Sequence, residues 1–467
     1  MNIIHWFRQD LRLKDNPSFY HGTKKGQLLP LYIFDDHHSS KKPIGAASQC
    51  WLHHSLTQLN EQLENHLMIA KGDPLDIIPK LIKSHHIDAV YWNRCYEPWQ
   101  QKRDHKLIEQ LKDQGITVET YNGSLLWEPW EIQTKEGSHY KVFTPFYKKG
   151  CLNAMEPRTP LPKPQKISYV SHKKQMETIE SLNLLPSLSW GKKIMDTWRV
   201  GETAAKKSLN TFIDDHLSHY DEGRNFPANQ HISRLSPHLH WGEISPHEIW
   251  HAIKKLSQTN STASFLSELG WREFSYNLLY HHQTLPYKNL QEKFNNFPWT
   301  NSKKMLAAWQ QGMTGYPMVD AGMRELWQTG FMHNRLRMVT ASFLVKNLLI
   351  HWHEGERWFW DCLLDADLAN NSASWQWVAG CGADAAPFFR IFNPVTQGKK
   401  FDPTGEYIRR YVPELTHLPN KYLYAPWEAP ESVLKEADIT LGQTYPKPIV
   451  DLSQSRQYAL DAYKDIK

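Results

Sequence analysis

The chain opens with Ile-Ile-His-Trp-Phe at residues 3–7, the first of five short apolar runs that decide the fold. Leu-Leu-Pro-Leu-Tyr-Ile-Phe follows at residues 28–34, and shorter runs lie at 67–70, 89–92 and 116–121, with helical stretches at about 46–65, 74–84 and 100–114. Alternating apolar strands and helices are typical of a parallel sheet with helices on both faces. The sequence therefore predicts a Rossmann-like parallel α/β domain over residues 1–130, although no Gly-rich nucleotide-binding motif follows any of its strands.

The rest of the chain divides into a basic segment and a helical domain. Residues 131–200 contain six prolines and 12 Lys/Arg against six Asp/Glu, a surplus of 12 − 6 = +6. Such a composition favours a long interdomain linker, which we place at residues 131–197. From residue 198 to 467 the pattern is helical, with clear examples at 262–281, 317–328 and 333–350. The predicted architecture is α/β followed by all-α.

Composition excludes several classes of protein. With 40% hydrophobic, 22% charged and 12% aromatic residues, the 467-residue chain can build sizeable cores. Its longest apolar runs fall short of the roughly 18–20 residues that cross a bilayer, so we expect no membrane partner. Five scattered cysteines without a CxxC pair indicate reduced thiols and a cytoplasmic location. The 25 histidines lack partners at recognised ligand spacings, so we predict no metal site.

Two predicted helices carry polar and aromatic side chains on a shared face. In the helix at 262–281, Glu268, Trp271 and Arg272 stand at positions i, i+3 and i+4. In the helix at 333–350, Asn334, Arg337 and Met338 form one stripe, which would suit a flat heteroaromatic ligand. A surface ion pair beside a core residue explains the first set equally well, and a satisfied polar patch explains the second.

Two further segments are candidates for a bound polar group. Residues 365–374 place two acids, two amides and two serines between apolar helices, and buried polar groups of this density need partners. Trp375 and Trp377 follow, about 200° apart on a helix, so they face different surroundings. Ser233-Arg-Leu-Ser236 before Pro237 is similar to an anion-binding turn, although the same pattern is a common helix entry.

Taken together, these segments identify the chain as resembling the photolyase/cryptochrome family over nearly its whole length, closest to bacterial class I-like photolyases. The segments that carry the resemblance occur in family order: Trp6–Pro17, Ser233–Pro237, Trp271–Phe274, Gly315–Pro317, His333–Met338, Asp365–Trp377 and Gly382–Pro394. The resemblance implies that the helical domain binds FAD and that the α/β domain holds an antenna chromophore. It also implies a carbon–carbon lyase that splits cyclobutane pyrimidine dimers in UV-damaged DNA under blue light.

The resemblance also assigns the residues that would hold FAD. Asn371 would face flavin N5, where its neutral amide matches photolyases, and Asp365, Asp367 and Arg337 would bracket the flavin and adenosine. The residues implied in FAD binding are Tyr220, Ser233, Arg234, Leu235, Ser236, Trp271, Arg272, Asn334, Arg337, Asp365, Asp367 and Asn371. Trp375, Trp352 and Trp299 match the family's relay, which carries electrons to the oxidised flavin.

A separate set of residues is implied at the lesion. Trp271 and Trp377 would stack on the flipped-out dimer, an arrangement for which photolyases are a known example. Glu268 would bond the pyrimidine edge, and Asn334 with Met338 would favour the cyclobutane dimer over the (6-4) photoproduct. Arg224, Arg335 and Arg390 would contact DNA phosphates, together with the DNA-facing Glu268, Trp271 and Trp377.

The antenna chromophore and the rival functions complete the predictions. Glu97 and Lys288 are similar to a folate site, so 5,10-methenyltetrahydrofolate is preferred over a deazaflavin as antenna. The rivals are a cryptochrome photoreceptor without repair activity and a helical nucleic-acid-binding protein without cofactor; retention of Trp377 argues against a single-strand-preferring relative. Asn371, Trp377, Glu268 and the absence of a long tail favour a monomeric repair enzyme over a photoreceptor.

Overall fold

The computed structural model describes residues 1–36, 42–171, 176–186, 189–385 and 390–466. By its internal contacts the chain forms two compact units. The first unit comprises residues 1–218, 233–283 and 364–369, and the second comprises residues 219–232, 284–363 and 370–467. This division differs from the predicted boundaries at residues 130 and 198, because helices that follow the sheet pack into the first unit.

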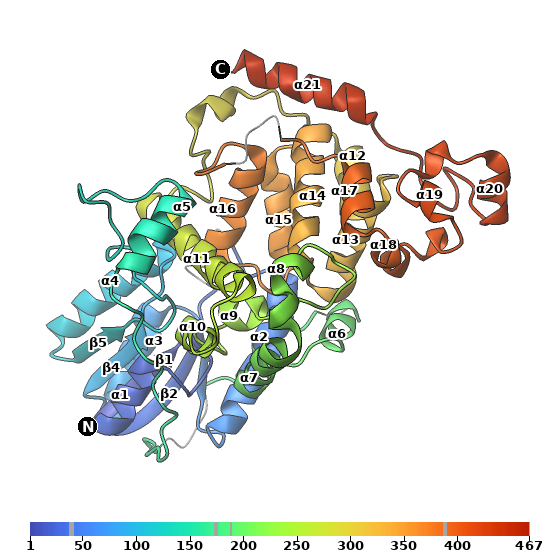
Figure 1. Cartoon of the computed structure of the whole chain (residues 1–467). Coiled ribbons are helices and arrows are strands. Elements are labelled where there is room, and N and C mark those ends of the chain that lie inside the picture. Colours follow the sequence, from blue (N-terminus) through green and yellow to red (C-terminus); the bar gives the residue numbers. More distant parts are fainter. Residues whose placement is uncertain (37–41, 172–175, 187–188, 386–389, 467) are drawn as a thin grey trace. The chain divides into compact units, whose positions relative to one another are not determined.

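The predicted parallel sheet is confirmed (Figure 1). Its strand order is β3-β2-β1-β4-β5, and every neighbouring pair is parallel. The elements of this α/β layer are β1 (Asn2–Phe7), α1 (Pro17–Lys25), β2 (Gln27–Phe34), α2 (Ala46–Gln62), β3 (Met68–Lys71), α3 (Pro74–His85), β4 (Ala89–Asn93), α4 (Pro98–Asp113) and β5 (Thr117–Tyr121).

Side chains of β1 show how the sheet is covered on both faces. Ile4 and Trp6 belong to a core that includes Ile78 of α3 and Leu107 of α4. His5 and Phe7 point to the opposite face, since successive strand residues alternate, and both rings contact Phe19 of α1. The sheet is therefore buried between α1 on one face and α3 with α4 on the other.

The segment at 131–197, predicted as an interdomain linker, packs within the first unit. Phe143, Phe146 and Cys151 are buried, Val170 joins the core of the sheet, and Leu28 forms a bridge with Tyr169. The prolines and lysines correctly indicated little regular structure, but the apolar residues between them anchor the segment to the first unit. It contains the short helices α5 (Phe143–Pro145) and α6 (Trp190–Met195) and, between them, a π-helical turn at Phe146–Gly150 and a 3₁₀ turn at Cys151–Asn153.

The remaining helices of the first unit lead to α11, the longest helix described. They are α7 (Glu202–Thr211), α9 (Ser236–His240), α10 (Pro246–Lys254) and α11 (Asn260–His281). A reciprocal pair of hydrogen bonds between Thr259 and Thr262 begins α11, a capping box that satisfies free backbone N–H groups. The helix predicted at 262–281 is thus confirmed, with its start two residues earlier.

The second unit is helical, as predicted for the C-terminal part. Its helices are α8 (Tyr220–Gly223), α12 (Lys303–Gln310), α13 (Pro317–Thr329), α14 (Asn334–Ser342), α15 (Trp352–Cys362), α16 (Leu368–Ala379, whose first two residues belong to the first unit), α17 (Pro394–Phe401), α18 (Glu406–Tyr411), α19 (Asn420–Leu423), α20 (Glu431–Glu436) and α21 (Leu452–Asp465). Gly330, at φ 67°, ends α13 where a glycine is needed. The single helix predicted at 333–350 is instead α14 followed by a π-helical turn at Phe343–Asn347.

Among the described residues, no helix combines the length and apolarity required to cross a membrane. The five cysteines are all buried and free.

Candidate functional site

In the first unit, α11 brings Glu268, Trp271 and Arg272 together as predicted. All three are partly accessible. The Trp271 ring is stacked on Phe143, with 3.7 Å between centroids and 11° between planes. One face of the predicted stacking platform is therefore supported by an aromatic neighbour that sequence reasoning missed.

Arg272 is held by the protein itself. Its Nη1 donates to the carbonyl of Ser124 at 2.8 Å and pairs with Glu273 at 3.1 Å, and its guanidinium lies over Tyr276. Burial raises the pKa of Glu273 to about 7, against the opposing effect of Arg272 and two backbone N–H groups. Glu273, which was not among the predicted site residues, is buried.

Asp367 is the centre of a buried polar cluster in the first unit. Tyr276 donates a hydrogen bond to it, and His240 Nδ1 lies 3.9 Å from its Oδ2. Burial and the charge of Asp367 raise the pKa of Tyr276 well above its ordinary value. Burial, and then the same carboxylate, raise the pKa of Glu97, which accepts a hydrogen bond from Trp99 at 2.6 Å. Glu97, predicted as an antenna ligand, thus lies among the residues assigned to the flavin side.

The turn at 233–236 has the features expected of an anion-binding loop. Arg234 adopts a left-handed conformation with φ 52°, and the N–H of Leu235 points to Ser233 Oγ at 3.4 Å. The Arg234 guanidinium lies 4.0 Å from the centroid of Trp198, so the indole fixes its position. Ser236 begins α9 and is only partly buried.

In the second unit, α14 carries two predicted contacts for the lesion and one for DNA. Asn334 is exposed at the first position of α14, and Met338 is half-buried one turn later. Arg335 donates to Asn225 and lies over Phe401. Burial and the nearby Arg224 lower the pKa of Arg335.

The two predicted phosphate ligands Arg224 and Arg335 are therefore near enough for the charge of Arg224 to lower the pKa of Arg335. Arg224 also lies over the buried ring of Tyr220. Arg337 donates from Nε to the carbonyl of Met332 and lies over Phe331.

Asn371, assigned to flavin N5, is oriented by a residue that the sequence did not indicate. Its Nδ2 donates to the carbonyl of Glu356 at 3.1 Å and approaches Glu356 Oε1 at 3.3 Å. Because the amide nitrogen is engaged there, the amide oxygen points away from Glu356 as a hydrogen-bond acceptor. Rotation of the amide would place its oxygen against two acceptors.

The three predicted relay tryptophans differ in burial. Trp375 and Trp352 are fully buried and Trp299 is partly exposed. His351 connects the last two, with its ring centroid 5.6 Å from Trp352 and 5.1 Å from Trp299. Burial lowers the pKa of His351, so this ring is neutral at pH 7 and does not oppose a positive charge on either indole.

Trp375 and Trp377 project differently from α16, as predicted. Trp375 is packed against Phe359 and Trp309, with centroids at 4.9 and 6.2 Å, whereas Trp377 is partly exposed. Below Trp375, Gly355 of α15 lets the indole approach the backbone.

Replacing Gly355 by alanine is expected to destabilise the second unit. The added Cβ would lie 2.1 Å from Trp375 Cη2 and 2.6 Å from Leu344 Cδ2. Overpacking of this kind costs about 1–3 kcal/mol, which denaturant unfolding would show as a lower midpoint. Arg357→Ala, an exposed change on the same helix, serves as the control; equal stability of the two variants would contradict the packing described.

The remaining predicted residues are exposed or lie at the edge of the described chain. Arg390 is exposed, and its carbonyl accepts a hydrogen bond from the buried Lys346 at 3.1 Å. Lys288 is exposed, and its carbonyl binds Gln376. The motif at 382–394 runs through residues 386–389, which are outside the described part of the chain.

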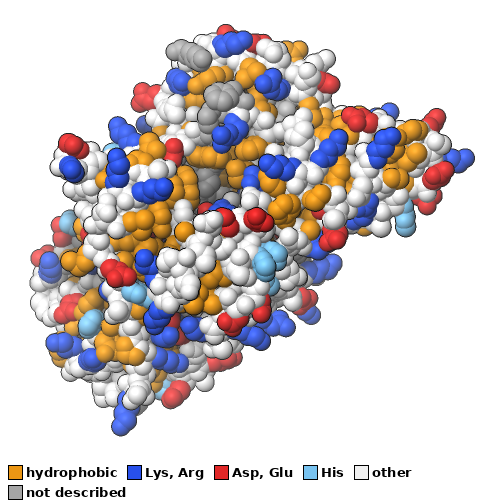
Figure 2. All heavy atoms as spheres, viewed as in Figure 1, with side chains coloured by type: hydrophobic (Ala, Val, Ile, Leu, Met, Phe, Trp, Pro, Cys, Tyr) orange, Lys and Arg blue, Asp and Glu red, His pale blue; other side chains and the backbone are white. Residues whose placement is uncertain are grey.

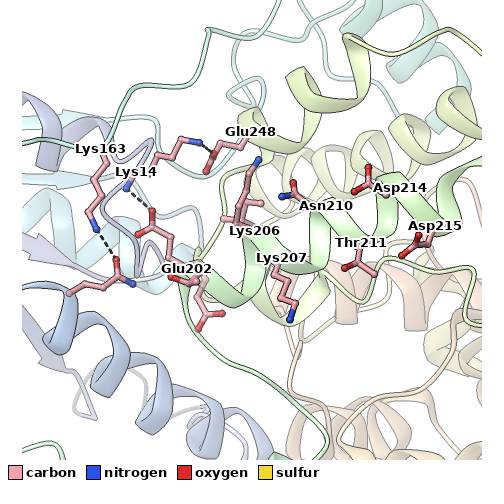
Figure 3. A pocket seen from close by; sticks show the side chains of 14 residues that line it. Lys14, Lys163, Glu202, Lys206, Lys207, Asn210, Thr211, Asp214, Asp215 and Glu248 are labelled. Carbon is pink, nitrogen blue, oxygen red and sulfur yellow. Dashed lines mark hydrogen bonds and ion pairs between the residues drawn. The ribbon is translucent and has the colours of Figure 1, made fainter.

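A cavity of about 590 Å³ in the first unit lies apart from the predicted residues (Figure 3). It is bordered by Lys206 and Lys207 of α7, by Asp214 in the turn that follows α7, and by Lys14 and Lys163. Lys14 is paired with Glu248, and Glu202 accepts from the backbone N–H groups of residues 13 and 14. The ion pair between Lys14 and Glu248 thus joins two of the walls of this cavity.

The buried polar groups fit a flavin nucleotide. His240 Nδ1 and Ser372 Oγ are buried without a hydrogen-bond partner among the described residues. In the first unit, the carboxylates Asp365 and Asp367 could accept hydrogen bonds from flavin N–H groups, and the turn at 233–236 suits phosphate. In the second unit, Asn371 offers an oriented amide oxygen as a further acceptor. Within the described residues, no group of three or more His, Cys, Asp or Glu could hold a metal ion.

Comparisons with known proteins agree with this chemistry. Residues 3–165 match the family described as DNA photolyase, and residues 265–465 match the FAD binding domain of DNA photolyase. A deoxyribodipyrimidine photo-lyase of Agrobacterium fabrum is 48% identical over 100% of this chain and 98% of its own length. The chain belongs to the photolyase/cryptochrome family.

Two further members place the chain within this photolyase/cryptochrome family. The crystal structure of a bacterial class III photolyase from Agrobacterium tumefaciens is 47% identical, with a TM-score of 0.96, and covers 100% of this chain and 97% of the other. Cryptochrome-1 of Arabidopsis thaliana is 37% identical over 97% of this chain and 69% of its own length. The expected closeness to class I photolyases is therefore corrected, since the similar structure is of class III.

Proposed function

We propose that this protein is a light-dependent DNA-repair enzyme that splits cyclobutane pyrimidine dimers, acting as a monomer with bound FAD. The observation that carries the proposal is the joint presence of Glu268 and Trp271 on one face of α11 and of Asn334 and Met338 on one face of α14. The family resemblance assigns these residue types to the splitting of a cyclobutane dimer. The photolyase names of the similar proteins support it.

The resemblance implies FAD-binding residues in each unit. In the first unit these are the turn at 233–236, Trp271, Arg272, Asp365 and Asp367, and in the second they are Tyr220, Asn334, Arg337 and Asn371. When bound and reduced, FAD supplies the electron that opens the cyclobutane ring. Asn371, held by Glu356 with its amide oxygen as an acceptor, suits a protonated partner atom and keeps it protonated.

Side chains of the protein would bind and orient the lesion. Trp271, supported from behind by Phe143, and Trp377 would stack on the flipped bases. Glu268 would hydrogen-bond the pyrimidine edge and share a proton with it as negative charge develops. Arg224, Arg335 and Arg390 would contact phosphates and fix the position of the strand.

The proposal also includes an antenna chromophore and a cellular compartment. We propose 5,10-methenyltetrahydrofolate as the antenna chromophore, with the exposed Lys288 as a ligand. Glu97, the second proposed ligand, is buried beside Asp367 and is therefore less accessible to the chromophore. Five free, buried cysteines suit the reducing cytoplasm.

The proposal is tested with UV-irradiated plasmid DNA and purified, chemically reduced protein. Blue light should remove the sites cut by a dimer-specific endonuclease, and dark incubation should leave them. Flavin-loaded, reduced protein that binds no damaged DNA and repairs nothing under light would instead favour a cryptochrome photoreceptor. A colourless protein that does not take up FAD would overturn both.

A further inference from the structure

Residues 141–155 of the first unit form an amphipathic segment whose outer face has no part in the site described above. At about 100° per residue, its helical portion turns Phe146, Tyr147 and Gly150 inward, and all three are buried. Lys149 and Leu152 point outward and are exposed. The inner face packs on the unit, and the outer face is presented to solvent.

The inner face connects this segment directly to the predicted lesion platform. Tyr147 is stacked on Phe143 with centroids 5.6 Å apart, and Phe143 is stacked on Trp271. A Cβ on Gly270 would lie 2.4 Å from Tyr147 Cδ2, so α11 approaches the segment as closely as only glycine permits. The outer face is therefore fixed relative to Trp271 and Glu268.

The outer face is basic. Residues 141–156 contain three lysines, Lys141, Lys148 and Lys149, and one acid, Glu156, a surplus of 3 − 1 = +2. All three lysines are exposed, and no ion pair of theirs occurs within the described ranges. In Figure 2, Lys or Arg side chains and hydrophobic side chains lie next to one another where Figure 1 places α5.

Two exposed apolar side chains accompany the lysines on an ordered backbone. Leu152 is 48% and Met155 is 90% exposed. Trp127 donates to the carbonyl of Met155 at 2.9 Å, and Asn153 donates to the carbonyl of Lys149 at 3.2 Å. Leucine and methionine beside cationic groups are what proteins place against unstacked bases of distorted DNA.

We infer that residues 141–155 are a second DNA-contacting surface, which binds the duplex beside the lesion. Lys141, Lys148 and Lys149 contact phosphates, and Leu152 with Met155 packs against bases left without their stacking partner when the dimer is flipped out. This inference rests on the proposed function and adds to it a specific partner surface: duplex DNA flanking the lesion.

The lysines are tested by the triple change Lys141→Gln, Lys148→Gln and Lys149→Gln. Binding of a fluorescent duplex with one cyclobutane dimer is measured across a salt series. Each lost phosphate contact lowers the slope of log affinity against log salt by about 1, so a decrease of about 2–3 is expected, for damaged and undamaged duplex alike. The control carries the same charge change at exposed lysines of the α/β layer, Lys80, Lys83 and Lys112.

The apolar pair is tested by the double change Leu152→Ser and Met155→Ser. Affinity for the lesion-bearing duplex should fall severalfold, and affinity for undamaged duplex should not change, because only a flipped dimer leaves unstacked bases. FAD absorbance and the unfolding midpoint report whether either variant is misfolded.

The outcomes separate this inference from the proposed function. If the wild-type protein repairs dimers but the triple variant keeps the wild-type salt slope, or matches the control, the surface binds no DNA and the inference is wrong. If the wild-type protein neither prefers nor repairs damaged duplex, the proposed function fails. A smaller slope in the triple variant, with the wild-type slope in the control, supports the inference.

Discussion

Replacing Trp352 by phenylalanine is expected to suppress light-driven reduction of bound, oxidised FAD and to leave repair by chemically pre-reduced protein intact. Trp352 is fully buried and lies, through His351, beside the partly exposed Trp299. Phenylalanine keeps most of the volume but is much harder to oxidise than indole. The passage of an electron from the surface to the flavin therefore loses its middle step.

Absorbance at the flavin bands under blue light, with an external reductant, follows this reaction. The variant also loses the hydrogen bond from Trp352 Nε1 to Asn289 at 2.8 Å, which is worth about 1 kcal/mol of stability. Trp427→Phe, which alters another tryptophan of the second unit that is packed on Tyr316, is the control and should photoreduce normally. Loss of both photoreduction and pre-reduced repair in Trp352→Phe would refute the relay assignment.

Replacing Glu268 by alanine is expected to reduce the repair yield strongly, with a smaller effect on affinity for damaged DNA. A hydrogen bond to a charged group is worth about 1.5–3 kcal/mol, and a loss of this size at the reacting state lowers a rate by at least roughly tenfold. Repaired dimers per absorbed photon and the Kd of the same duplex are measured in parallel.

Glu268→Gln distinguishes the two roles of this side chain. Glutamine can still hydrogen-bond the pyrimidine edge but cannot share a carboxylic proton, so its yield should lie between those of alanine and the wild type. A large loss of affinity with an unchanged yield in Glu268→Ala would assign the residue to binding instead.

Local patterns were sufficient to predict most of the fold. Short apolar runs located all five strands to within one or two residues. The helix predicted at 46–65 ends earlier, at Gln62, because Glu64 and Asn65 adopt left-handed conformations. Proline and lysine content does not indicate that Phe143 and Phe146 are buried and anchor the predicted linker to the first unit.

Candidate site residues could be proposed from motifs, but their supporting contacts could not. Motifs identified Asn371, Trp271 and the relay tryptophans, whereas their neighbours Glu356, Phe143 and His351 lie far away in sequence or carry no pattern. The surroundings of Glu97 could not be predicted either, because its neighbour Asp367 lies 270 residues further along the chain. Such pairs depend on tertiary packing, which a single sequence does not encode locally.

The most direct test of the account is photorepair of defined lesions by chemically reduced protein. One duplex carries a single cyclobutane thymine dimer and the other a single (6-4) photoproduct, each under near-UV/blue light and in the dark. We expect light-dependent loss of the cyclobutane dimer alone. Asn334 and Met338 occupy the two positions at which, by the family resemblance, (6-4) photolyases have histidines. Persistence of the cyclobutane dimer under light, or repair of the (6-4) lesion, would contradict the account.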